Sequence, residues 1–332
     1  MTALAHAWCA WLCATFQGGG LPWPLAAGAQ PFPLRATYGQ IQGKTSAVDL
    51  HFGLDVLTDA TVVEGDSVRA MEGGEVVAIN KGSDYRSGLV IRSTAGRLLL
   101  YLHLDPSTIP FALGSVVPTG ASLGTVTWMD PQALGRHVHV SVLSQVPPAW
   151  TGIDRMSSGD PRLLLETVGD VVAPVAVAFP DGRKLAVRTN EVSGSTYAAN
   201  GKIKAGELDV IAHLRDLDRT GSTHPLAPAS AELTVSEGGQ VIETFTLDFD
   251  QPLDPWHNVE KAFYNRDSRH KSRAWRPLGE FEYYFVLTNA RGTDVATDNA
   301  WHATPGSYKL RVRAWDAAGK ELDFQEDLVV LP

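Results

Sequence analysis

Cysteine is almost absent from this chain of 332 residues, which contains only Cys9 and Cys13. Both lie in an apolar stretch at residues 3–16, ahead of the position where we expect a signal peptide to be cleaved. The mature chain would then contain no cysteine at all. A disulfide framework and a thiolate metal site are therefore excluded.

Positive charge is also scarce, with 28 Lys and Arg residues against 37 Asp and Glu residues and a net charge of −9. A protein of this balance has no broad basic face with which to neutralise phosphates, so a nucleic acid is not an expected partner. The same balance provides no polybasic membrane anchor.

Long apolar runs are missing as well. Residues 3–16 are too short to span a membrane but have the length of a signal-peptide core, and Ala27-Gly28-Ala29 fits a small-x-small cleavage site. We therefore expect a signal peptide at residues 1–29 and a secreted or periplasmic protein of the cell envelope. No Lys or Arg precedes the apolar core, so a misassigned start or an N-terminal tail is the alternative.

The length suggests two domains, and the 31 glycines and 20 prolines suit β structure rich in turns. Residues 51–143 contain short strand patterns separated by glycine and proline. We predict an all-β protein whose first domain, at residues 30–145, is an antiparallel β sandwich or sheet with a groove. A linker follows at residues 146–170. Alternating strands and a closing hairpin predict an immunoglobulin-like β sandwich at residues 171–332.

Four of the ten histidines and one aspartate lie in or beside these strand patterns. In residues 136–143, valines alternate with polar residues, so His137 and His139 share one strand face. His103 ends the apolar run at residues 97–103. His51 and Asp55 are four residues apart, and the glycine between them argues against a helix interior.

Imidazole nitrogen and carboxylate oxygen are ligands that zinc prefers. A catalytic zinc keeps three protein ligands and one position for water, so two histidines and one acid would suffice and two histidines would remain for proton transfer. The chemistry that this combination favours is metal-assisted hydrolysis, in which zinc lowers the pKa of water to about 7 and polarises a carbonyl group.

Three motifs occur in order along this region: H-x-G-x-D at residues 51–55, Y-x-H-L at residues 101–104 and G-x-H-x-H at residues 135–139. Together they resemble the lysostaphin/LytM-type zinc metalloendopeptidases, which are peptidoglycan hydrolases of metallopeptidase family twenty-three. Residues 63–79 and 114–120 resemble further segments of that family. The resemblance covers roughly residues 45–145.

By position, the resemblance implies that Zn²⁺ is bound by His51, Asp55 and His139. It implies that His103 and His137 are catalytic residues that do not bind the metal, and either one could be the general base. The chain departs from the family in the loop at residues 125–132, which contains Trp128 where the family usually has a Gly-Thr-Gly-rich loop. This departure leaves the substrate preference open.

The function predicted from these residues is zinc-dependent hydrolysis of the peptide cross-links of bacterial peptidoglycan. The alternatives are a non-catalytic cell-wall-binding or hydrolase-activator protein on the same scaffold, and a zinc peptidase that acts on proteins. The C-terminal domain is expected to position the enzyme on the wall or on an envelope protein partner.

The second half of the sequence contains no comparable constellation of ligands. Asp216 and Asp218 favour a solvated turn over a calcium site. Residues 263–276 are locally basic and favour a solvated loop over a contact with anionic glycan or peptide carboxylates.

Overall fold

The computed structural model describes only part of the chain. The described residues are 20–25, 34–37, 41–44, 47–57, 67–82, 86–127, 136–150, 153–157, 161–165, 172–189, 196–216, 226–248, 283–289 and 300–332. Several predicted features lie outside them, namely Cys9, Cys13, most of the signal peptide, the Trp128 loop, Asp218 and the basic segment at residues 263–276. In the described residues no helix is long and apolar enough to cross a membrane.

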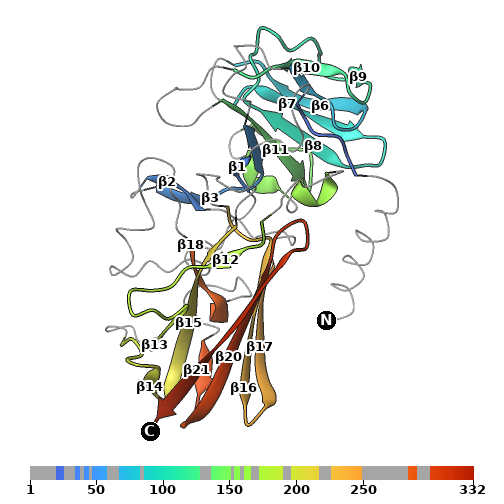
Figure 1. The fold of residues 1–332 in the computed structure, drawn as a ribbon. Coiled ribbons are helices and arrows are strands. Elements are labelled where there is room, and N and C mark those ends of the chain that lie inside the picture. The colour runs from blue at the N-terminus through green and yellow to red at the C-terminus, as the bar shows by residue number, and fades with distance from the viewer. Residues whose placement is uncertain are drawn as a thin grey trace.

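The N-terminal half, which we define as residues 20–165, contains one seven-stranded antiparallel sheet (Figure 1). Its strands, in spatial order, are β1 (Leu34–Ala36), β4 (Leu54–Leu57), β11 (His137–Leu143), β8 (Leu98–Leu102), β7 (Gly88–Ser93), β6 (Gly74–Asn80) and β9 (Val116–Val117). Two small sheets accompany it: β10 (Ser122–Thr125) with β5 (Ser67–Arg69), and β2 (Ile41–Lys44) with β3 (Ala47–Leu50).

The central strand β8, with the sequence LLLYL, is buried along its whole length. Leu99 and Tyr101 on one face join the main hydrophobic cluster of this half, which we call the N-terminal core. Leu98, Leu100 and Leu102 on the other face join a smaller cluster with Ile153. Alternation along the strand therefore explains why an uninterrupted apolar run occurs here.

Two short 3₁₀ helices, η1 (Ile153–Met156) and η2 (Pro161–Leu164), lie in the segment predicted as a linker. Their side chains pack into the N-terminal half, since Ile153 belongs to the smaller cluster and Leu164 and Leu165 belong to the N-terminal core. The domain boundaries stay predictions, but the described part of the linker is bound to the first half.

Residues 20–25 also pack into this half. Trp23 and Leu25 are buried in the N-terminal core, and Leu21 and Leu25 form single β-bridges with Leu165 and Val68. Cleavage after residue 29 would remove these contacts. The signal peptide stays a prediction, but this packing argues against cleavage after residue 29.

The C-terminal half, which we define as residues 172–332, contains two five-stranded sheets (Figure 1). One sheet is β12 (Val175–Ala176), β15 (Gly206–Arg215), β13 (Leu185–Thr189), β18 (Tyr283–Val286) and β19 (Trp301–Ala303), with η3 (Leu287–Asn289) after β18. The other is β14 (Lys202–Lys204), β21 (Glu321–Leu331), β20 (Gly306–Trp315), β16 (Ser230–Glu237) and β17 (Gln240–Asp248). The pairs are antiparallel except β14 with β21.

Side chains from both sheets form one hydrophobic cluster, which we call the sandwich core. Leu208, Val210, Ala212 and Leu214 enter it from β15, and Tyr308, Leu310 and Val312 enter it from β20. The predicted alternation and closing hairpin of this half are present. The all-β architecture is therefore confirmed, while the immunoglobulin-like topology stays a prediction.

The prediction of a solvated turn at Asp216 is wrong. Asp216 is completely buried, and its carboxylate lies 3.6 Å from the guanidinium group of Arg162, which is also buried. A carboxylate is stable in such a position because an opposite charge accompanies it. Sequence spacing gave no indication of this pair, since its members are far apart along the chain.

Candidate metal site

Three adjacent strands of the seven-stranded sheet bring the five predicted site residues together. Asp55 lies on β4, His137 and His139 lie on β11, and His103 directly follows β8. His51 lies in the segment between β3 and β4. All five side chains are buried. Residues separated by up to 88 positions thus share one site because their strands are neighbours in the sheet.

Strand register accounts for the position of the aspartate. His139 pairs directly with Asp55 across β11 and β4, and His137 pairs with Leu57. Directly paired residues point to the same face of a sheet, and residues two apart on one strand do so as well. Asp55, His137 and His139 therefore project from the face opposite the N-terminal core.

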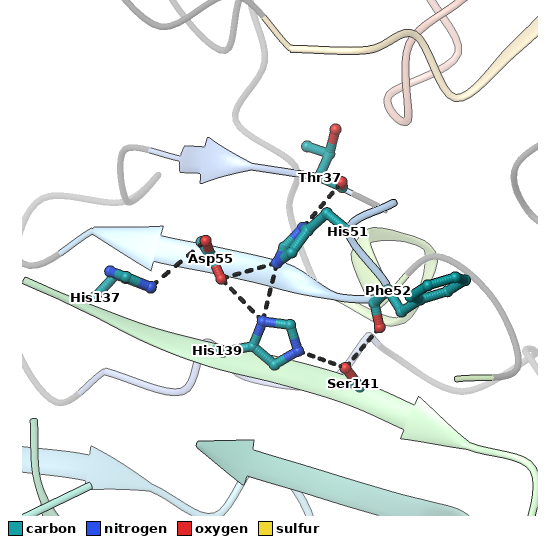
Figure 2. Close-up of polar contacts among 7 residues, drawn as sticks. All are labelled: Thr37, His51, Phe52, Asp55, His137, His139 and Ser141. Carbon is teal, nitrogen blue, oxygen red and sulfur yellow. Dashed lines mark hydrogen bonds and ion pairs between the residues drawn. The ribbon is translucent and has the colours of Figure 1, made fainter. Parts of the chain in front are cut away.

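The centre of the site is a triangle of two nitrogens and one oxygen (Figure 2). His51 Nε2 lies 3.0 Å from Asp55 Oδ1, His139 Nδ1 lies 2.9 Å from Asp55 Oδ1, and the two nitrogens are 2.9 Å apart. Ligand atoms of a tetrahedral zinc with bonds of about 2.0–2.1 Å are about 3.3 Å apart. A small expansion of this triangle would accommodate the ion.

The outer nitrogen of each histidine in the triangle has a partner in the protein. His51 Nδ1 lies 3.1 Å from the Thr37 carbonyl oxygen, which can only accept a hydrogen bond. His139 Nε2 lies 2.8 Å from Ser141 Oγ, and that hydroxyl donates to the Phe52 carbonyl oxygen at 2.7 Å. Because the serine hydrogen is used in this way, Ser141 Oγ accepts the N–H of His139.

These outer bonds determine which nitrogen of each neutral ring carries the hydrogen. His51 Nε2 and His139 Nδ1 then face Asp55 Oδ1 with lone pairs. Three acceptors at such short separation repel one another unless a cation lies between them. An outer hydrogen bond that orients a ligating histidine is usual in metal sites, so the residues present fit a bound zinc ion.

Asp55 is held as a carboxylate. Burial alone would raise its pKa, but the neighbouring imidazole groups of His137, His51 and His139 outweigh burial and hold the pKa of the carboxyl well below its usual range. An ionised carboxylate is the form that binds a metal.

His103 and His137 lie beside this triangle. Their ring centroids are 4.7 Å apart, and His137 Nε2 lies 3.5 Å from Asp55 Oδ2. His103 follows Leu102, so strand alternation would send its side chain to the N-terminal core. Instead its backbone has φ of +67°, a left-handed conformation that is uncommon outside glycine, and the ring lies next to His137. Backbone strain of this kind concentrates at functional sites.

Gly53 is the centre of the H-x-G-x-D motif. A Cβ atom there would lie 2.5 Å from His139 Nε2 and 2.5 Å from Ser141 Oγ. The His139 ring thus packs directly against the backbone of residue 53, and only glycine leaves room for that ring.

Two groups of side chains satisfy the spacing of metal ligands among the described residues. One is His51, Asp55 and His139, and the other is Asp55, His103 and His137. The site therefore brings together all five residues singled out in the sequence, and Asp55 belongs to both groups.

Residues 45–148 match peptidase family M23. The matched segment contains all five residues of the candidate site. No curated protein matches the chain.

Three solved peptidase structures are similar to part of this chain. The catalytic domain of lysostaphin from Staphylococcus simulans is 19% identical over 41% of this chain and 93% of that one, with a TM-score of 0.31. The catalytic domain of the prophage-encoded M23 protein EnpA from Enterococcus faecalis is 21% identical over 40% and 91%, with a TM-score of 0.29. A zinc-containing peptidase from Vibrio cholerae is 21% identical over 38% and 36%, with a TM-score of 0.30.

Three contributors to this site were missed in the sequence. Ser141 could have been found, because it lies two residues after His139 on the same strand and so on the same face. Thr37 and Phe52 act through backbone carbonyl oxygens, which every residue type has. A sequence pattern therefore cannot identify which backbone carbonyl oxygens contribute to the site.

Proposed function

We propose that this chain is a zinc-dependent endopeptidase that hydrolyses the peptide cross-links of bacterial peptidoglycan in the cell envelope, as a secreted or periplasmic protein. The observation that carries the proposal is the convergence of His51 Nε2, His139 Nδ1 and Asp55 Oδ1, with the outer nitrogens of both histidines bonded to the protein. The match to peptidase family M23 supports the reaction class.

We assign His51, Asp55 and His139 as the metal ligands. The outer partners described above leave both histidines with a lone pair toward Asp55 Oδ1, and this favours the first of the two ligand groups. A zinc ion held by these residues would supply a Lewis acid to polarise the scissile carbonyl and acidify water.

His103 and His137 are assigned to proton transfer. In hydrolysis the water oxygen bonds to the carbonyl carbon, the C–N bond breaks, and a proton reaches the leaving nitrogen. One of the two histidines takes a proton from the attacking water, and the other donates a hydrogen bond to the carbonyl oxygen as negative charge develops on it. Their adjacent rings allow both roles at one peptide bond.

The test is a digest of purified peptidoglycan by the full chain loaded with zinc. We expect soluble peptides with new termini, identified by mass spectrometry, and their loss when a chelator is added. Added zinc should restore the release, which controls for damage by the chelator.

Sedimentation of the zinc-loaded chain with the wall, without release of peptides, would contradict an enzymatic role and favour a wall-binding or activator protein. Cleavage of unfolded proteins but not of wall would contradict the substrate class alone.

Replacing Ser141 tests the ligand orientation. In Ser141→Ala the His139 Nε2–H loses its acceptor, so the ring no longer has one preferred orientation. We expect zinc affinity to fall about 10–100-fold, as is typical when an outer partner of a ligand is removed. The measurement is competition with a chromophoric chelator.

Ser144→Ala is the matched control for this variant, since Ser144 Oγ also donates to a backbone carbonyl oxygen, that of Met156, but at an exposed position. Equal zinc affinity in the Ser141 and Ser144 variants would refute the role of Ser141.

A further inference from the structure

Phe52 lies directly between His51 and Gly53, and its ring points away from the metal site (Figure 2). The side chain is only 3% exposed and belongs to the sandwich core. Every other buried member of that core lies at residue 185 or later. The residue next to a proposed metal ligand therefore packs into the hydrophobic core of the C-terminal half.

The C-terminal half makes the reciprocal contribution. Leu226 is the one residue beyond 165 among the buried members of the N-terminal core. It is held by two backbone hydrogen bonds with Asp216, at 2.7 and 2.9 Å. The carboxylate of Asp216 forms the buried ion pair with Arg162 of η2.

Three buried contacts join the two halves. Phe52 packs in the sandwich core, Leu226 packs in the N-terminal core, and one ion pair connects the two halves. An ion pair that is removed from water is costly to break when its charges stay buried, because each charge then lacks its partner. The position of Phe52 is therefore set by the sandwich as well as by its neighbours in sequence.

The backbone of Phe52 connects this packed side chain to the metal site. Its carbonyl oxygen accepts the hydroxyl of Ser141, which in turn accepts the N–H of His139. The preceding residue is His51, whose ring must point at Asp55. A shift of Phe52 would thus disturb both proposed histidine ligands.

We propose that Phe52 is a positioning residue through which the C-terminal sandwich holds the metal centre in its binding geometry. The inference rests on the proposed metal centre. It gives the sandwich a role inside the active site, in addition to any role in attaching the enzyme to wall or to a partner.

The test is metal affinity in the full chain, measured by Co²⁺ titration of the visible d–d absorption. We expect Phe52→Ala to bind Co²⁺ at least about 10-fold more weakly and to show an altered spectrum, as for loss of a group that orients a ligand. Phe52→Leu keeps part of the apolar volume and should fall between Phe52→Ala and the unmodified chain.

The matched control is Leu233→Ala on β16, a fully buried member of the same core that lies on the sheet of β20 and β21. It should lower the unfolding temperature but leave Co²⁺ affinity and the spectrum unchanged, at a temperature where circular dichroism shows both variants folded. Unchanged affinity in Phe52→Ala, or an equal loss in Leu233→Ala, would overturn the inference.

Two further outcomes are decisive. Should Phe52→Ala not fold, Phe52→Leu decides: an affinity loss larger than that of Leu233→Ala supports the role of Phe52, and unmodified affinity overturns it. Failure of the unmodified chain to bind Co²⁺ or zinc would instead remove the metal centre itself, so the two proposals fail in different ways.

Discussion

His139→Ala is expected to lose both bound zinc and peptidase activity. The substitution removes one corner of the triangle formed with His51 Nε2 and Asp55 Oδ1. It also leaves Ser141 Oγ without the N–H that it accepts. Removal of an outer partner alone costs about 10–100-fold in metal affinity, and we expect removal of a ligand to cost more.

His103→Ala is the contrasting variant, because the proposed ligand set does not include it. We expect it to retain one zinc per chain and to lose about 10²–10⁴-fold in the rate of peptide release, the usual contribution of general acid–base catalysis. The two variants should be compared by metal analysis after dialysis and by the peptidoglycan digest.

This pair of variants separates the two possible ligand groups. Stoichiometric zinc in His139→Ala with loss of zinc in His103→Ala would show that Asp55, His103 and His137 hold the metal instead. Zinc and activity retained in both variants would refute the site altogether.

Gly53→Ala is expected to be nearly as damaging as loss of a ligand. The added Cβ would lie 2.5 Å from His139 Nε2 and from Ser141 Oγ, far inside van der Waals contact, so the ring or the backbone must move. Overpacking of this kind typically costs about 1–3 kcal/mol of folding free energy. The displaced ring should also lower zinc affinity by at least about 10-fold, since the bond to Ser141 is lost.

Gly82→Ala is the control for this substitution. Gly82 is exposed, and its added Cβ would meet only the flexible side chain of Asn80, at 3.1 Å. Thermal unfolding and chelator competition should show little change in this variant. Normal zinc affinity in Gly53→Ala would mean that His139 can move aside, and that its close packing against residue 53 is not needed for metal binding.

The site was largely accessible to prediction because strand geometry is regular. The two-residue period placed His137 and His139 on one face, and neighbouring strands make that face common to β4 and β11. The same reasoning would have placed His103 incorrectly, since alternation directs it to the other face. Its left-handed backbone brings it to the site, and no local pattern in the sequence indicates a positive φ at a histidine.

The predicted linker and the predicted turn at Asp216 illustrate what could not be foreseen. Both are polar or rich in turn residues, and such composition usually indicates exposure. Burial of Arg162 and Asp216 instead depends on their meeting each other. A partner distant in sequence leaves no periodic signal at either residue.

The sequence by itself determined the all-β architecture and the five residues of the candidate site. Each of these follows from local spacing, since alternation, glycine breaks and ligand motifs are properties of short segments. Only the tertiary structure decided that Phe52 packs in the sandwich core, that Leu226 packs in the N-terminal core, and that the Thr37 carbonyl oxygen orients His51. These contacts depend on how distant segments pack against one another, and packing is a property of the whole folded chain.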